Sequence, residues 1–412
     1  MELKNKYQYT YFIYPYIINE KKYDKYIARL LKNKKCSMRF FEREKDLEIY
    51  QHFLTFMKKY MFANFQYNKE RQENLKEFNL DMQASMLAQN DCNVFEYELG
   101  ENVQGKTDAE NGIFFRIQKI EIICFKAGIC FICIKTNIES SNKFEDVLNF
   151  NYKFRDINSD LTSLKEYENI KIQTNDLEDV KMISEVIRDI TGTDIKKDLL
   201  DININRFFTY SYVCLEQEYW NEQRDFSNLE NDFLKFVNVL PSNYNSVFDK
   251  KHIDTNFNVF SKWGYIKNGF SKFGSTLLSS GTDTYNYTKL PYIYENEYLY
   301  TYIFVLYQKI YLKKLLIEFK DARNAKKVRK DFMDFTKNVW IQEITNDSTG
   351  TQIYNIWKEI LEVNDIYNDM KSKYNILYKE LNIEKETKTN KIVSTLLIVS
   401  LIVNILIFAK II

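Results

Sequence analysis

The feature that most constrains this chain is a run of eighteen residues without a charge, IVSTLLIVSLIVNILIFA, from Ile392 to Ala409. At about 1.5 Å per residue, a helix of this length spans ~27 Å, close to the roughly 30 Å hydrocarbon core of a membrane. A buried core helix is the alternative, but the run has no polar face. We therefore expect a transmembrane helix over 391–412, at a position in the sequence that excludes a signal peptide.

The charges that flank this run predict its orientation. Lys385, Lys388 and Lys391 precede it, whereas only Lys410 follows. Positive charge collects on the cytoplasmic side of membrane helices, so we expect the large N-terminal part to face the cytoplasm. Lys, Asn and Ile are abundant, as is typical of AT-rich bacterial genes. The expectation is a tail-anchored, single-pass protein of a bacterial inner or cell membrane.

An apolar seam precedes the run. Its members recur at spacings of three and four: Ile353, Trp357, Ile360, Val363, Tyr367, Met370, Tyr374, Leu377 and Leu381. Such near-heptad spacing predicts one helix from Thr351 to Ile412 with a coiled-coil-like face. The seam could pack on the chain's own helices or on copies of itself, and its bulky aromatic residues favour a bundle wider than a two-stranded coil.

Polar residues within and before the run suggest contacts. Ser400 and Asn404 lie four residues apart, on one face of the predicted helix. An amide in lipid needs a polar partner, so these two residues either fix self-association by an interhelical hydrogen bond or line a pore in a homo-oligomer. A basic cluster is either a solvated helix face or a contact with anionic lipid. Its members are Lys326, Lys327, Arg329, Lys330, Lys388 and Lys391.

The rest of the chain predicts a mixed body. Residues 114–124 and 129–136 are rich in β-branched and aromatic residues and are joined by Phe-Lys-Ala-Gly, which predicts a hairpin at the centre of a sheet. Strands are also expected at 9–18, 92–99 and 207–215, and helices at 22–34, 46–62 and 70–89. The predicted class is α/β (α+β): a cytoplasmic body at 1–294, a helical stalk at 295–390 and a membrane helix at 391–412.

Several classes of chemistry find no support. The net charge is +1, which gives no electrostatic case for binding nucleic acid. With only ten glycines, the chain has neither phosphate-loop nor dinucleotide-binding motifs. Cys130 and Cys133 form a C-x-x-C on a predicted strand, where positions three apart face opposite ways, so a shared metal is not expected. His52 and His252 lack the context of a catalytic triad. We expect no cofactor and no enzymatic activity.

The layout resembles the CorA-like magnesium transporter superfamily. The residues that carry the resemblance are the seam from Ile353 to Leu381, then Thr389-Asn390-Lys391 before Ser394-Thr395-Leu396-Leu397, and the hairpin segment Ile120 to Ile134 followed by NFNYKFR at 149–155. The resemblance implies membrane attachment and homo-oligomers in which a span lines the pore. The Gly-Met-Asn signature and a second span are absent from this sequence, so no selectivity residue carries over.

Two hypotheses follow. In the first, a homo-oligomeric, CorA-like membrane protein conducts ions along a path lined by Ser400 and Asn404. In the second, the span is only an anchor, and the body acts as an interaction, sensor or defence protein. Both include membrane lipid as a partner.

Overall fold

The structure is a computed structural model, and it describes residues 2–63, 69–99, 104–106, 113–155, 171–173, 181–192, 206–244, 258–320 and 325–409. By its internal contacts the chain forms two compact units. The first contains Met1–Tyr311 and Ile341–Val363, and the second contains Leu312–Trp340 and Asn364–Ile412. The expected division at 294 and 390 stays a prediction, and each unit is described by itself below.

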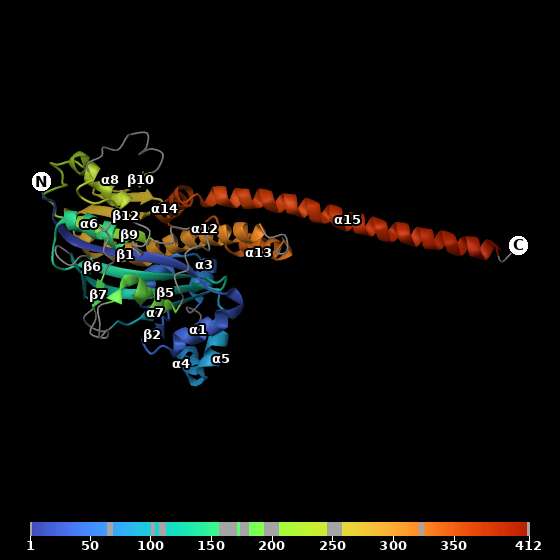
Figure 1. Cartoon of the computed structure of the whole chain (residues 1–412). Helices are drawn as coiled ribbons and strands as arrows, with labels where there is room; N and C mark the ends of the chain where they lie inside the picture. Colours follow the sequence, from blue (N-terminus) through green and yellow to red (C-terminus); the bar gives the residue numbers. More distant parts are fainter. Residues whose placement is uncertain are drawn as a thin grey trace. The chain divides into compact units, whose positions relative to one another are not determined.

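The first unit is built on one mixed sheet, which confirms the α/β class (Figure 1). Within the described residues, the strands in spatial order are β10-β11-β12-β9-β1-β6-β5-β4-β7-β8, and β3 also pairs with β5 and carries β2. All pairs are antiparallel except β12 with β9. The strands are β1 (Asn5–Ile17), β2 (Cys36–Met38), β3 (Cys92–Tyr97), β4 (Gln104–Lys106), β5 (Phe114–Phe125), β6 (Ile129–Ile138), β7 (Lys171–Gln173), β8 (Lys181–Met182), β9 (Phe208–Leu215), β10 (Asn258–Phe260), β11 (Ile266–Ser271) and β12 (Gly274–Ser280).

The predicted hairpin is confirmed at the centre of this sheet. β5 and β6 pair from Phe125↔Ile129 outward, and Gly128 has a φ of 77° in the turn between them. Glycine is needed there because it adopts a positive φ readily, and because a Cβ atom at this position would lie 2.7 Å from the carbonyl oxygen of Ile18. Because both faces of the sheet are covered, nearly every residue of the hairpin's turn-proximal half is buried.

Strand β1 shows how Pro15 fits into a central strand. β1 pairs with β6 along its second half and with β9 along its first, but the pairing with β9 ends at Ile13. Pro15 therefore lies where β1 is locally an edge, and its missing N–H interrupts no ladder there. The edge expected from this proline is present, although only over the last residues of the strand.

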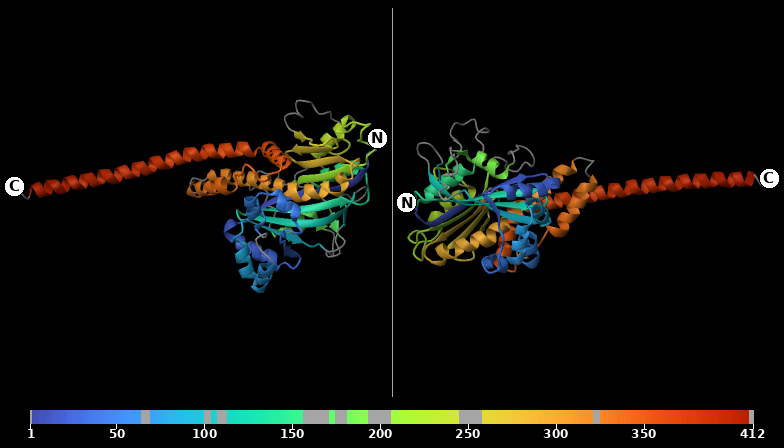
Figure 2. Two further views of the ribbon diagram at one scale, coloured as in Figure 1. Left: turned by 180° about the vertical axis from the view of Figure 1, so that it is seen from behind. Right: turned by 90° about the horizontal axis from the view of Figure 1, so that it is seen from below.

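Helices pack on both faces of the sheet (Figure 2). One face carries α1, α5, α6, α7 and α8 around a core that includes Phe12, Ile122 and Ile132. The other face meets a π-helix, Tyr294–Tyr298, and the start of α12. The helices are α1 (Tyr23–Lys32), α2 (Leu47–His52), α3 (Thr55–Met61), α4 (Lys69–Glu77), α5 (Leu80–Leu87), α6 (Phe144–Phe154), α7 (Ile183–Thr191), α8 (Glu230–Asn238), α10 (Tyr285–Thr288), α11 (Leu290–Ile293), α12 (Leu299–Phe319), α13 (Ala325–Asn338), α14 (Ser348–Ile360) and α15 (Val363–Ala409).

The prediction of one helix from Thr351 onward is wrong. The helix breaks between α14 and α15 at Glu362, whose φ is 58°, a left-handed conformation that ends a helix without glycine. The expected helix at 46–62 likewise divides into α2 and α3 at Phe53, whose backbone bridges to Thr345. The apolar periodicity of the sequence continues through both breaks. The positions of these breaks are set by tertiary contacts rather than by helix propensity.

The second unit pairs α13 with the start of α15 through aromatic rings. Tyr367 stacks on Trp340 with centroids 3.8 Å apart and planes 2° apart, and Phe332 lies 5.7 Å from the same tyrosine. Phe332 also contacts Tyr374, which lies two turns after Tyr367 on α15. These seam residues therefore pack on one of the chain's own helices. In the first unit, Trp357 of the seam packs on Tyr302 of α12.

Candidate functional site

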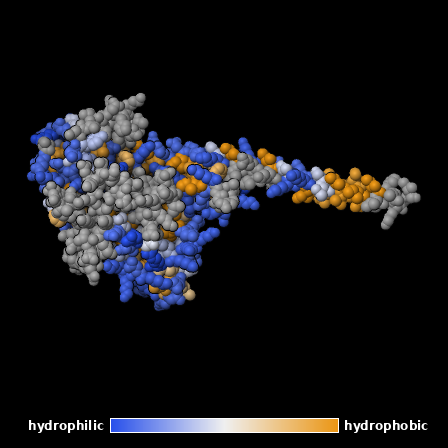
Figure 3. Space-filling model, viewed as in Figure 1, coloured by the Kyte–Doolittle hydropathy of each residue, from blue (hydrophilic) through white to orange (hydrophobic). Residues whose placement is uncertain are grey.

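The most unusual surface belongs to the C-terminal half of α15. Ten large apolar side chains there are each about half exposed or more, and Figure 3 shows hydrophobic residues gathered along this part of the helix. They are Ile392, Val393, Leu396, Leu397, Ile398, Val399, Leu401, Ile402, Val403 and Ile405. Transferring a side chain of this kind from water to an apolar environment stabilises by about 1.5–3 kcal/mol. The segment as a whole therefore favours lipid by roughly 15–30 kcal/mol.

Length and composition agree with this surface. Residues Glu386–Ile405 form a helical stretch long and apolar enough to cross a membrane, and none of it is buried. A core helix of similar composition would be covered by its own protein, so its burial distinguishes the two cases. The described part of the chain thus contains one candidate membrane-spanning helix, at the place where the sequence predicts it.

Ser400 and Asn404 both lie on this apolar segment, and both are exposed. Four residues along a helix return to the same face, so the two polar groups form a short stripe in an otherwise apolar surface. Lys388 and Lys391 are exposed earlier on the same helix. Lys410 lies outside the described residues.

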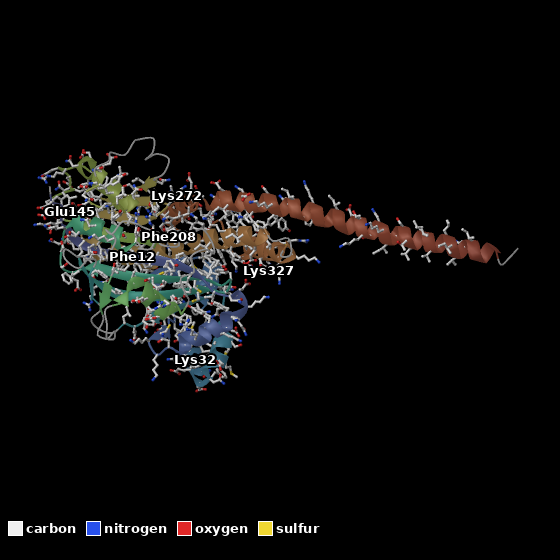
Figure 4. All side chains as sticks on the ribbon, in the orientation of Figure 1. Phe12, Lys32, Glu145, Phe208, Lys272 and Lys327 are labelled. Atoms are coloured by element: carbon white, nitrogen blue, oxygen red, sulfur yellow. The ribbon has the colours of Figure 1, made fainter. Side chains whose placement is uncertain are left out.

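The other basic residues lie on α13, and one of them is engaged by acids. Lys327, labelled in Figure 4, lies 2.9 Å from Glu318 and 3.7 Å from Asp331. Arg329 lies over the ring of Tyr378 on α15, 5.3 Å from its centroid. Lys326 and Lys330 are exposed. The positive charge of this cluster is thus partly neutralised within the second unit.

A charged cluster that sequence analysis missed lies on the α12 face of the sheet. Glu121 of β5 is 1% exposed, and its Oε1 atom lies 2.6 Å from Arg39 Nη1 and 3.0 Å from Lys119 Nζ. Tyr300 of α12 donates a third hydrogen bond to the same oxygen at 3.0 Å. Burial alone would raise the pKa of Glu121, but Lys119 and Arg39 outweigh it and lower the pKa to about 2.

A second ion pair continues the cluster across the sheet. Lys135 of β6 pairs in register with Lys119 of β5, and its Nζ atom lies 2.6 Å from Oε2 of Glu295 in the π-helix. Tyr11 of β1 donates to the other oxygen of Glu295, also at 2.6 Å. Each buried cation thus has an acidic partner, which is the pattern of a structural ion network.

His52, the histidine within the described residues, has a structural environment. His52 is almost fully buried, and its Nδ1 atom lies 3.0 Å from Oε2 of Glu297. A Cβ atom at Gly350 would lie 2.8 Å from the His52 ring, so α14 begins directly against the imidazole. The histidine therefore joins α2, the π-helix and the start of α14. His252 lies outside the described residues.

The cysteines are all buried and free. Cys130 belongs to the core on one face of the sheet, whereas Cys133 lies beside Glu121 on the other, as the strand period predicts. Burial raises the pKa of the Cys133 thiol well above its usual range, which keeps it protonated and unreactive. Within the described residues, no group of His, Cys, Asp and Glu side chains is arranged to hold a metal ion.

Comparison with protein-family models, with curated protein sequences and with solved structures returns no match for this chain.

No sequence motif indicates the charged cluster, because Arg39, Glu121 and Glu295 do not recur at a fixed spacing along the chain. One weak signal was present: Glu121 is an acid in the middle of a predicted central strand, where a charge needs a buried partner.

Proposed function

We propose that this protein is held at a membrane by α15 and presents its α/β unit at the cytoplasmic surface. The observation that carries the proposal is the exposed apolar surface of α15 from Ile392 to Ile405. Water is an unfavourable solvent for such a surface, and a monomeric soluble protein rarely exposes a contiguous apolar patch of this size. The lysines at 388 and 391 support the cytoplasmic orientation of the unit.

The charged cluster supports an anchoring or interaction role for the α/β unit rather than catalysis. Arg39 and Lys119 both pair with Glu121, which also accepts from Tyr300, and Lys135 pairs with Glu295, so these described groups hold the sheet to α12 and the π-helix. We infer that the unit serves as a binding or signalling module at the membrane, and that α15 supplies the location.

Cysteine labelling tests the orientation. All six native cysteines are buried, so a cysteine introduced at the exposed Ile383 would be the principal site for a membrane-impermeant maleimide. The proposal predicts labelling of Ile383→Cys in inside-out vesicles and none in right-side-out vesicles. A matched variant, Lys410→Cys, should show the opposite pattern. Equal labelling of Ile383→Cys in both preparations would refute a fixed orientation.

A second candidate function is an ion path through a homo-oligomer, as the CorA-like resemblance implies. It is favoured by the polar stripe of Ser400 and Asn404 on an apolar helix. Under this proposal, Asn404→Leu abolishes conductance of the reconstituted protein, whereas the apolar exchange Ile405→Leu preserves it. A detergent-solubilised monomer, measured by light scattering, would eliminate the pore.

A further inference from the structure

A basic stripe lies along the outer face of α1. Lys25, Arg29 and Lys32 follow one another at spacings of four and three residues, so they share one side of the helix, and all three are exposed. Lys21 and Lys22, just before α1, extend the stripe and are exposed too. The opposite side of α1 packs into the core through Tyr23, Tyr26, Ile27, Ala28 and Leu30. The whole stripe therefore faces solvent.

Positive charge concentrates in this part of the chain. Residues 20–35 hold seven basic and two acidic side chains, an excess of five, although the whole chain has a net charge of only +1. Helices α4 and α5 contribute three basic and four acidic residues, which leaves most of that excess in place. Within the described residues, the three lysines of the stripe that precede Arg29 form no ion pair, whereas Arg29 donates to the carbonyl oxygen of Thr191 at 2.8 Å. The stripe can therefore attract an anionic partner.

An apolar ridge lies beside the stripe. Phe78, Met82 and Met86 recur every four residues, just before and along α5, and they are 42%, 47% and 37% exposed. The other side of α5 is buried through Ala84 and Leu87. Helices α1 and α5 pack against each other, and the Nζ atom of Lys32, labelled in Figure 4, lies 3.1 Å from Oδ1 of Asp81. Because Asp81 directly precedes Met82, the stripe and the ridge adjoin each other on the first unit.

Lysines beside exposed apolar side chains suit the surface of an anionic bilayer. The ammonium groups contact the lipid headgroups, and the apolar side chains enter the boundary between headgroups and acyl chains. A stripe of lysines alone would suit any polyanion, but a nucleic acid or an acidic protein segment in water offers no hydrocarbon to Met82 and Met86. The ridge therefore favours lipid as the occupant of this surface.

We propose that the basic stripe of α1 and the apolar ridge of α5 bind the anionic surface of the membrane, as a contact separate from α15. This inference rests on the proposed membrane location, because α15 confines the first unit close to a bilayer and makes a weak contact effective. Each lysine near an anionic surface strengthens binding about fivefold, and the attraction falls as salt shortens the Debye length. The contact holds the first unit against the membrane.

Fluorescence of the full-length protein in nanodiscs tests this contact. Because all six native cysteines are buried, Met82→Cys can be labelled selectively with an NBD maleimide, whose emission rises in an apolar environment. We expect severalfold stronger emission in nanodiscs of phosphatidylcholine mixed with phosphatidylglycerol than in phosphatidylcholine alone. This difference should vanish at about 1 M salt, where the Debye length is roughly 3 Å. Gln223→Cys, at an exposed residue elsewhere in the first unit, should emit equally in both lipids.

Charge variants of the labelled protein test the stripe. Lys21→Glu combined with Lys25→Glu should abolish the difference between the two lipids. Lys45→Glu combined with Lys289→Glu, also at exposed residues, should preserve it. Equal emission in both lipids at low salt, a difference that survives the reversal of Lys21 and Lys25, or a rise produced by RNA or polyglutamate but not by anionic lipid would overturn the proposal. A protein that fails to co-elute with the nanodiscs would overturn the anchoring by α15, and this contact with it.

Discussion

At the scale of single residues, two buried groups hold the sheet to the helices around it. Glu121 accepts from Arg39, Lys119 and Tyr300, which come from the segment after β2, from β5 and from α12. His52 fills the space against Gly350. Because each of these residues joins several elements, replacing one of them should affect the stability of the whole first unit.

Replacing Glu121 should give a pH-dependent loss of stability. Its folded pKa of about 2 lies below the reference value of 4.5, so its contribution is complete above pH 4.5 and disappears as the pH falls toward 2. Since the carboxylate is fully buried, the difference amounts to about 3 kcal/mol. Glu121→Gln should lose this amount at pH 7, and urea unfolding of the two proteins should converge near pH 2.

The matched control is Glu139→Gln, whose half-exposed pair with Arg116 spans 3.3 Å. Exposed pairs contribute about 0–1 kcal/mol, so this variant should unfold almost like the parent. A Glu121→Gln protein whose deficit is the same at pH 3 and pH 7 would contradict the assigned ion network.

Gly350→Ala should destabilise the protein, although alanine is normally the better helix residue. Gly350 lies in the first turn of α14, and a Cβ atom there would approach both His52 and Thr345 to 2.8 Å. Relieving such overlap costs about 1–3 kcal/mol, which exceeds the helix-propensity gain of about 1 kcal/mol. Gly264→Ala, with no atom within 4 Å of the added carbon, is the control. Equal melting temperatures for the two variants would refute the close packing.

At the scale of elements, α13 pairs with α15 through ring contacts, and Tyr367 makes several of them. Tyr367→Ala removes the ring that stacks on Trp340 and contacts Phe332. We expect the free energy of local opening of α13 to fall by about 2 kcal/mol. Amide hydrogen exchange in α13 should therefore become roughly thirtyfold faster. Tyr378→Ala, at a ring that is 44% exposed, should change exchange by a few fold at most. Similar exchange in both variants would contradict the pairing.

The elements also show what the sequence could predict. The β5–β6 hairpin and β9 were predictable, because alternation, β-branched residues and Gly128 all indicate the same structure. The break at Glu362 was not, because its left-handed φ occurs at a residue type that rarely adopts it. The ion network was equally hidden, since it joins residues as far apart as Tyr300 and Glu121.

At the scale of the whole molecule, one chain combines a mixed sheet with a helix whose surface suits lipid. The apolar run was the strongest signal in the sequence, and the structure leaves it uncovered on every side. The register shifts between Asn5 and Tyr7 in β1 and between Ile117 and Lys119 in β5 could not be predicted, because they leave no trace in periodicity.

The most direct test of the account is the partitioning of the full-length protein after lysis without detergent. Following ultracentrifugation and an alkaline carbonate wash, we expect the protein to remain in the membrane pellet. A variant with Leu397→Lys and Leu401→Lys should move to the supernatant, since each charge at the centre of a span costs about 2.5–3.5 kcal/mol. Recovery of the unaltered protein in the detergent-free supernatant, folded and unaggregated, would contradict the account.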